Sequence, residues 1–408
     1  MKKFAAIIVI IIITLSVFFA FWAKRGVKQS ENELVFWTLQ LGTFDKYITK
    51  IISDFESENP EIKIKWVDVP YSEGEKRTLA ALLSDNPPDL INLTPDFSAM
   101  AAQKNALYEI PQDAMEQFPN GLLPLLSYKG KVFAIPFYLT SAVTYANKSI
   151  LSKAKITSFP KTFEDMYALS ETIKTQTGCY VEMPALSEND TFWKVLNKYG
   201  VNVFTNIDGD VSRDIFKMYE SAYKNNLIPR ESITQGHREA LEKYMAGQVA
   251  FLQAGANFLN IIKENAPTVY EETEIIPQLT GKNAKYDLSL MNLIIPRKAK
   301  NKEYALKFAL FLTNEQNQLE LAKLTSVLPA NKNALNNEYF KKNSSKEEIA
   351  RNISAKQIMN IAPNIENTRH KKNVILLLNS TLAKILTGKK DLSQGLVDLK
   401  EKIKDYEE

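Results

Sequence analysis

Hydrophobic and polar residues alternate with two different periods along the first hundred residues. Apolar runs and strict alternation predict strands, and apolar side chains three or four positions apart predict helices. By these patterns the segment contains a strand, a helix, a strand, a helix and a strand, at residues 34–41, 44–58, 62–69, 74–85 and 89–93. Asn59-Pro60 and Pro87-Pro88 end the two helices. This β-α-β-α-β order predicts a parallel sheet with helices packed over it.

The remainder of the chain continues to mix strands and helices. Residues 127–148 predict a hairpin with Gly130 at its turn, which runs into an extended segment. A helix at 162–178 has Thr162 as its cap and Gly178 as its stop. Further helices are predicted at 187–199, 212–226, 236–246, 256–265 and 301–325, strands at 248–255, 274–279 and 288–296, and a helical tail at 346–408 punctuated by Gly388 and Gly395. This alternation indicates two lobes that the backbone crosses more than once.

The N-terminus carries an apolar segment between basic residues. Lys2 and Lys3 precede residues 4–23, which have no charged side chain, and Lys24 and Arg25 follow. A basic start before an apolar run is typical of a bacterial export signal. At about 1.5 Å rise per residue, the run is also long enough to span the ~30 Å hydrocarbon core of a bilayer. Since the segment ends without a good small-x-small cleavage pattern or a lipid-anchoring cysteine, we expect an uncleaved signal anchor with its tether at residues 1–30. A cleaved signal peptide is the alternative.

Composition and charge are those of a soluble globular protein. Of the 408 residues, 45% are hydrophobic and 24% charged, and the length suffices for two lobes of ordinary size. Five of the 51 basic residues lie in residues 1–30, which leaves 46 basic side chains against all 47 acidic ones. The folded part is therefore almost neutral, and we expect no nucleic-acid partner.

The sequence offers little for catalysis or metal binding. Cys179 is the single cysteine, and His237 and His370 are the two histidines, which argues against a Cys/His metal site or a cysteine nucleophile. The nucleophile elbow, phosphate loop, zinc-protease and calcium-loop motifs are all missing from the sequence. We expect no enzyme activity and no cofactor. A glycosidase that uses paired carboxylates is the competing hypothesis from another class.

The segment NPPDLINLTPDF at residues 86–97 places a carboxylate and an aromatic ring just beyond a short buried strand. Ligands of open parallel sheets bind beyond the carboxyl ends of the strands, and the loops at those ends hold residues 38–43, 69–74 and 92–97. We therefore expect Asp96 and Phe97 to line the mouth of a ligand cleft. Ordinary turn chemistry accounts for the Pro-Asp pair equally well.

An ordered series of segments resembles a known family. The series is VFWTLQ at 35–40, FESENPEIKIKW at 55–66, PPDLINLTPDF at 87–97, YKGKVFAIPFYLTSAVTYANKSIL at 128–151, MAGQVAFLQAGANF at 245–258, NKEYALKFALFLTNEQNQ at 301–318 and LPANKNAL at 328–335. Together these segments resemble the extracellular solute-binding proteins of ATP-driven importers, family 1, the maltose-binding-protein-like group, from about residue 34 to the C-terminus. Many relatives are freed by cleavage or held by a lipidated cysteine, and this chain shows neither feature.

The resemblance implies an α/β fold of the two-lobe periplasmic-binding-protein type (type II), with a ligand cleft between the lobes. It implies lobe 1 at 31–138 plus 258–325, lobe 2 at 139–257 plus 326–408, and hinge segments near 135–140, 253–257 and 324–329. The family function is to capture a solute, most often a sugar, to close the lobes and to deliver the solute to a membrane permease. We expect a monomer on the periplasmic or extracellular face of the cytoplasmic membrane.

Candidate ligand contacts follow from the chemistry of sugars. Aromatic faces pack against the C–H side of a sugar ring, and carboxylate or amide groups bond its hydroxyls. At the positions where the family places ligand contacts, the chain offers Thr38, Gln40, Asn92, Asp96, Phe137, Tyr138, Asp190, Trp193, Asn257 and Phe258. Trp193, with Asp190 before it, is the best stacking candidate in lobe 2, and a place in the core of its helix is the alternative. Structural roles at strand ends, in a turn or in packing are the alternatives for Thr38, Gln40, Asn92, Asp96, Phe137 and Tyr138. Asn364 and Arg369 are weaker candidates.

Two other roles remain open beside import of a sugar. The same fold serves sensors that bind a solute and signal to a membrane partner, and it serves receptors for other solutes such as glycerol phosphate. Side-chain types alone do not choose among these solutes.

Overall fold

The computed structural model describes residues 32–406 except 187, 189, 282–284, 359–360 and 362–369. The predicted apolar helix at 4–23 and the candidates Asn364 and Arg369 lie outside the described residues. Within the part of the chain that the structure describes, no helix combines the length and apolar character needed to cross a membrane.

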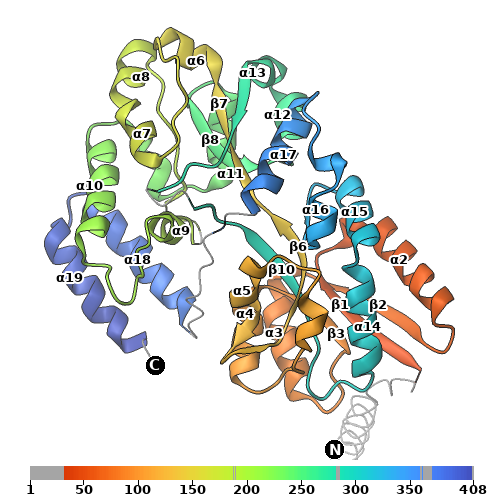
Figure 1. The fold of residues 1–408 in the computed structure, drawn as a ribbon. Coiled ribbons are helices and arrows are strands. Elements are labelled where there is room, and N and C mark those ends of the chain that lie inside the picture. Colours follow the sequence, from red (N-terminus) through yellow and green to blue (C-terminus); the bar gives the residue numbers. More distant parts are fainter. Residues whose placement is uncertain are drawn as a thin grey trace, which may run out of the picture.

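A mixed six-stranded sheet forms the centre of the first lobe (Figure 1). Its strand order is β11-β6-β10-β3-β1-β2, and β1 pairs in parallel with both β2 and β3, which confirms the predicted parallel start. β10 runs antiparallel to β3 and β6, and β11 runs antiparallel to β6. The strands are β1 (Glu33–Leu39), β2 (Lys63–Val69), β3 (Leu90–Leu93), β6 (Ile135–Thr140), β10 (Ser289–Ile294) and β11 (Leu328–Pro329).

Helices cover this sheet with their apolar sides. In α2, for example, Tyr47, Ile48, Ile51 and Phe55 recur at helical spacing and are buried. The helices of the first lobe are α2 (Asp45–Glu58), α3 (Tyr71–Leu83), α4 (Pro95–Gln103), α5 (Leu123–Leu126), α14 (Lys302–Leu312), α15 (Glu315–Leu324) and α16 (Lys332–Leu335). The predicted hairpin is present as β4 (Ser127–Tyr128) and β5 (Lys131–Val132), with Gly130 in its turn at φ 77°.

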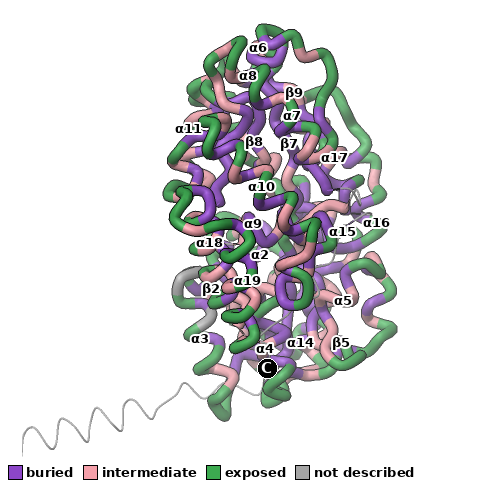
Figure 2. The backbone as a smooth tube through the Cα atoms, turned by 90° about the vertical axis from the view of Figure 1, so that its left-hand side faces the viewer, coloured by how far each residue is buried: buried purple, intermediate pink, exposed green. Residues whose placement is uncertain are grey.

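A three-stranded antiparallel sheet forms the centre of the second lobe. β7 (Ala142–Asn147) lies between β8 (Phe251–Gly255) and β9 (Thr273–Ile276). Around it lie α6 (Lys148–Lys153), α7 (Phe163–Ala168), α8 (Ser170–Thr177), α9 (Thr191–Lys198), α10 (Asp210–Lys224), α11 (His237–Met245), α12 (Phe258–Asn265), α13 (Pro267–Glu272), α17 (Lys346–Ile358), α18 (Lys371–Leu386) and α19 (Leu392–Ile403). Buried residues lie in the interior of both lobes, and exposed residues lie on their outer surfaces (Figure 2).

The packing moves two of the predicted lobe boundaries. α12, α13 and β9 pack on the second sheet, because β9 pairs with β7 and Leu259 and Tyr270 join the core around it. Residues 327–340 instead pack in the first core, through Leu328 and Phe340 among others. The predicted assignments of 258–276 to lobe 1 and of 326–340 to lobe 2 are therefore corrected by long-range pairing, which local sequence patterns do not report.

Some predicted helix boundaries also change. Thr162 and Asp165 form the expected capping box and Gly178 ends the segment at φ 73°, but the helix between them is divided into α7 and α8. The helix predicted at 301–325 is likewise two helices, because the Asn314 side chain accepts a hydrogen bond from the Asn317 amide and starts α15. Gly395, predicted as punctuation, lies inside α19.

Candidate functional site

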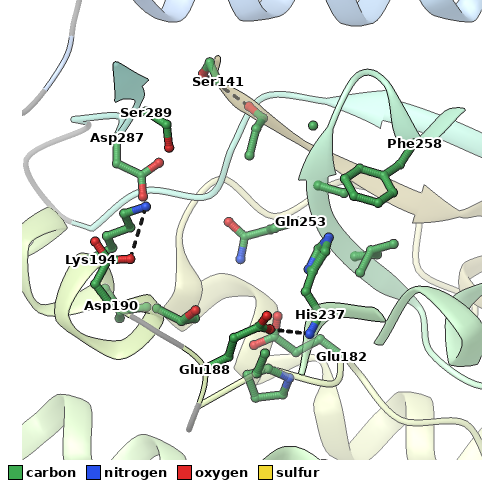
Figure 3. Close-up of a pocket in the computed structure, with 18 of the residues that line it drawn as sticks. Ser141, Glu182, Glu188, Asp190, Lys194, His237, Gln253, Phe258, Asp287 and Ser289 are labelled. Carbon is green, nitrogen blue, oxygen red and sulfur yellow. Dashed lines mark hydrogen bonds and ion pairs between the residues drawn. The ribbon is translucent and has the colours of Figure 1, made fainter. Parts of the chain in front are cut away.

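A cavity of about 450 Å³ lies where the strands that connect the lobes meet the second lobe. Thr140 at the end of β6 and Ser289 at the start of β10 contribute from the two strands that lead between the lobes, and Gln253 and Gly255 contribute from β8 of the second sheet. Residues 182–185 and Glu188 form another part of the wall, together with one side of α9. Figure 3 shows the polar side chains of these elements converging on the cavity, with Gln253 near its centre.

Two lysines one helical turn apart carry the positive charge of the cavity. Lys194 and Lys198 lie four residues apart on α9, so their side chains project from the same side of the helix. Lys194 pairs with Asp190 at 3.3 Å, and Lys198 lies 4.0 Å from Asp287 and donates a hydrogen bond of 3.0 Å to the Leu279 carbonyl. Each ammonium is therefore held by a carboxylate at the cavity edge.

Burial acts differently on the two ammonium groups. Burial lowers the pKa of Lys198, and the charge of Asp287 opposes this only in part. Burial also acts to lower the pKa of Lys194, but the carboxylates of Asp287, Asp190 and Asp96 outweigh it, so the pKa of Lys194 is raised. Lys194 therefore stays firmly charged, and Lys198 is the more readily deprotonated of the two.

Glu182 is the most deeply buried carboxyl group of the cavity wall, with 5% of its surface exposed. The Tyr167 hydroxyl donates a 2.7 Å hydrogen bond to its Oε1. Burial raises the pKa of Glu182 to about 7, although hydrogen bonding from Tyr167, the charge of Lys198 and a hydrogen bond with Gln253 act against the rise. The group therefore changes charge near neutral pH.

Another part of the cavity wall, away from the two lysines of α9, combines the carboxylate of Glu188 with the rings of His237 and Phe258. The Glu188 carboxylate accepts a hydrogen bond from the backbone N–H of His237, and the absence of a side chain at Gly236 allows this approach, since a Cβ there would lie 2.7 Å from Glu188 Oε2. The His237 ring packs edge-on against Phe258 with centroids 5.2 Å apart. Burial lowers the pKa of His237, and the charge of Glu188 opposes the change. His237 is therefore predominantly neutral at pH 7.

Three of the ten predicted site residues line this cavity: Asp190, Asn257 and Phe258. Asp190 is the residue before α9, and Asn257 and Phe258 lie where β8 leads into α12. Phe258 is half-buried and presents part of its ring to the cavity (Figure 3).

Two predicted polar contacts are instead used inside the first lobe. Thr38 is fully buried, donates a 2.7 Å hydrogen bond to Asp68 and accepts one of 2.8 Å from the Trp66 indole. Asn92 is also fully buried, and its amide donates to the carbonyl of Asn292 at 3.0 Å. Both therefore join neighbouring strands of the sheet, and neither lines the cavity.

Two predicted aromatic contacts are core residues. Trp193 is fully buried in the second lobe, where its ring meets Phe204 edge-on at 6.0 Å between centroids. Phe137 is fully buried in the first core. The prediction that these rings stack on solute is corrected, because neither ring has an accessible face. Phe97, expected at the cleft mouth, is likewise buried in the first core.

Gln40, Tyr138 and Asp96 lie in the first lobe and outside the cavity wall. Gln40 is exposed just after β1, at φ 52°, and the half-buried Tyr138 ring lies 5.9 Å from that of Phe44. Asp96 is exposed in the first turn of α4 and forms an ion pair with Lys371 of α18. Their ligand contacts remain predictions.

Five further residues line the cavity but were not predicted as site residues: Glu182, Lys194, Lys198, Gln253 and Asp287. A usable signal existed for Glu182, because it follows an extended segment whose Tyr180 pairs with Val249 beside β8. Lys198 had none, because TFWKVLNK mixes apolar and polar residues as any amphipathic helix does. Asp287 had none, because its place depends on how the chain returns from β9 to β10.

The arrangement suits reversible binding. It offers carboxylates and an amide as hydrogen-bond acceptors, ammonium and amide groups as donors, and one partly open aromatic ring. Among the described residues, no group of three or more His, Cys, Asp or Glu side chains is placed to hold a metal ion.

Comparison with known proteins finds relatives among the solute-binding proteins. Residues 50–348 match the profile of the bacterial extracellular solute-binding proteins. A galactooligosaccharide-binding protein of Bacillus subtilis (strain 168) is 26% identical over 399 residues, which cover 92% of this chain and 89% of that protein.

Solved structures agree with the fold. A protein of Synechococcus sp. MITs9220, assigned as an oligosaccharide periplasmic-binding protein, superposes with a TM-score of 0.82 at 27% identity, over 91% of this chain and 98% of its own. The maltose-binding periplasmic protein of Listeria monocytogenes, in complex with maltose, superposes with a TM-score of 0.74 over 92% of this chain and 99% of its own. At 18% identity, that second likeness shows the fold alone.

Proposed function

The chain belongs to the bacterial extracellular solute-binding protein family, and we propose that it is the carbohydrate receptor of an ATP-driven importer. In this role it captures a mono- or oligosaccharide outside the cytoplasmic membrane and delivers it to a permease. The oligosaccharide specificity of the relatives supports the choice of solute class. The apolar segment at residues 4–23 would anchor the receptor to the membrane.

The cavity between the connecting strands and α9 is the observation that carries this proposal. Glu182, Asp190 and Gln253 offer in-plane hydrogen-bonding groups for sugar hydroxyls, and Phe258 offers an apolar face for the ring. A cavity of about 450 Å³ is of the usual size for small-molecule sites. These groups suit reversible binding, and we propose no covalent step.

Capture would proceed by movement of the lobes about their connections. Ser141 is the single residue between β6 of the first sheet and β7 of the second, so the change of direction between lobes is confined to a short segment there. A solute that contacts both lobes favours the closed arrangement by its differential affinity. Asp190, Asn257 and Phe258 would hold the solute from the second lobe, and Gln40 and Tyr138 would meet it from the first.

An anionic solute such as glycerol phosphate is the second candidate, and the two lysines of α9 favour it. Lys194 and Lys198 present two ammonium groups to one cavity, and phosphate is a strong acceptor for such groups. Their existing partners, Asp190 and Asp287, would compete with that anion. For this reason the neutral carbohydrate is the better fit.

A thermal-shift screen tests the proposal. The folded protein is heated with galacto-oligosaccharides, maltodextrins, monosaccharides, polyols and sugar phosphates. A solute at a hundred times its dissociation constant should stabilise the protein by roughly 2.7 kcal/mol. We expect a carbohydrate to raise the melting temperature. Stabilisation by a sugar phosphate alone would replace the carbohydrate by the anionic candidate, and a panel with no effect would contradict both.

A further inference from the structure

An ion pair joins helices of different lobes. Nζ of Lys371, the first residue of α18, lies 2.8 Å from Oδ2 of Asp96, in the first turn of α4. The side chain of Lys371 is 15% exposed and that of Asp96 is 52% exposed, so the lysine is largely enclosed at this contact. The residues are 275 positions apart, and α4 belongs to the first core while α18 packs in the second.

The position of Lys371 within its own helix makes the pair informative. A cation at the N-terminus of a helix is disfavoured by the partial positive charge of the unpaired backbone N–H groups. Lys371 is at this unfavourable position, whereas Asp96 in the first turn of α4 is at a favourable one. The electrostatics of α18 therefore do not favour a lysine at position 371. The ion pair with Asp96 of the other lobe does favour it.

The charge of Asp96 also acts on Lys194, a second lysine of the second lobe. The carboxylate of Asp96 is one of the charges that raise the pKa of Lys194, after those of Asp287 and Asp190. Asp96 therefore contacts Lys371 of α18 and adds favourable charge at Lys194 of α9.

We propose that Asp96 and Lys371 form an ion-pair latch between the lobes, and that the arrangement in which α4 and α18 meet through this pair is the closed one, so that the latch stabilises closure before solute enters and thereby sets the affinity for solute. The latch itself needs no solute, and only its effect on affinity rests on the proposed function. Asp96 is then a positioning residue for closure and not a contact of the ligand.

The latch has a calculable consequence for binding. When solute binds the closed arrangement, the apparent dissociation constant is the intrinsic one divided by the closed fraction. Removing a partly exposed ion pair is expected to lower the closed-to-open ratio about threefold to fivefold. Where the closed form is the minor one, affinity for solute falls by the same factor.

Distances between the lobes test the latch directly. We would use the full-length chain with Cys179→Ser and spin labels at two strongly exposed positions, Leu83 at the end of α3 and Val397 on α19. Without solute, Asp96→Asn and Lys371→Met should each shift the distance distribution toward the longer, open distances. Raising the salt concentration to 1 M should shift the wild type in the same direction and the variants less.

A double-variant comparison separates the latch from unrelated effects. The Asp96→Asn/Lys371→Met protein should match either single variant, because both remove the same interaction. Glu303→Gln, which neutralises an exposed acid in the first turn of α14, is the matched control and should leave the distances unchanged.

The outcomes are separable from those of the proposed function. Unchanged distances in both single variants would overturn the latch, whatever solute the protein binds. Weaker binding in Asp96→Asn but not in Lys371→Met would also overturn it, since Asp96 would then be a ligand contact. A shift of distances in a protein that binds no carbohydrate would leave the latch standing and remove the proposed function.

Discussion

Single residues at the cavity illustrate what sequence patterns report and what they omit. Helical spacing correctly predicts that TFWKVLNK is a helix, but the direction of each side chain depends on what packs against it. Trp193 therefore faces the core, while Lys194 and Lys198 of the same helix reach the cavity. Phe258 was found because the resemblance to the family implies a ligand contact at its position, directly after β8.

The contrast between the two aromatic residues gives a first prediction. Trp193→Ala should lower the free energy of unfolding by about 3–5 kcal/mol, because it leaves a void in a close-packed core. Phe258→Ala should cost less stability than Trp193→Ala, because the ring is half-buried, and should weaken carbohydrate binding roughly fivefold, the effect of losing about 1 kcal/mol of ring contact. Urea denaturation and titration calorimetry measure the two effects. Full stability in Trp193→Ala would contradict its place in the core.

Glu182 gives a prediction about pH. Its pKa rises from an ordinary 4.5 to about 7 on folding, so the folded protein holds a proton that the unfolded chain releases in this interval. The stability that this proton contributes is complete below about pH 4.5 and is lost as pH rises through 7. Since Gln is uncharged throughout, Glu182→Gln should gain stability relative to the wild type by up to roughly 3 kcal/mol between these pH values.

Urea denaturation of both proteins at pH 5, 6, 7 and 8 measures this difference, because contributions of groups that do not interact with Glu182 cancel in the comparison. Parallel curves for the wild type and Glu182→Gln would show that the carboxyl group keeps its ordinary pKa in the folded protein.

At the scale of elements, most strands and helices follow from the sequence because their patterns are local. β1, β2 and β3 appear within two residues of their predicted bounds at either end, and the capping box at Thr162 is present. The breaks within the predicted helices at 162–178 and 301–325 were missed, since apolar spacing continues across them. Gly395 was wrongly predicted to interrupt a helix. It lies inside α19 and allows close packing on α18, because a Cβ there would lie 2.9 Å from a methyl group of Ile385.

The connection from β9 to β10 yields a prediction at this scale. A Cβ on Gly281 would lie 2.5 Å from the Lys198 carbonyl oxygen and 2.9 Å from Cγ of Tyr199, so the connection touches the end of α9 closely. Gly281→Ala should therefore cost about 1–3 kcal/mol of stability, as overpacking does. Gly121→Ala is the matched control, because its nearest contact would be an ordinary 3.7 Å. Equal stability of the two variants in urea would contradict the prediction, because the β9–β10 connection would then accommodate the added methyl group without loss of stability.

At the scale of the molecule, the resemblance correctly indicated two α/β lobes, and the boundaries at 258 and 326 were misplaced. Strand pairing over long distances decides them: β9 joins β7 in the second sheet, and β10 then returns to the first. The cavity is built where these connections meet, from residues as distant as Thr140 and Ser289. Local patterns place each element, but the site arises from how the chain returns between lobes.

The most direct test of the account is a calorimetric titration of the stabilising carbohydrate into the wild type and Gln253→Ala. Gln253 lies near the centre of the cavity, and Gln248, exposed before β8, provides the control variant Gln248→Ala. We predict one binding site in the wild type and the control, and at least tenfold weaker binding in Gln253→Ala, because a buried hydroxyl would lose its partner. Equal affinity in all three proteins would place the carbohydrate elsewhere and contradict the assignment of this cavity.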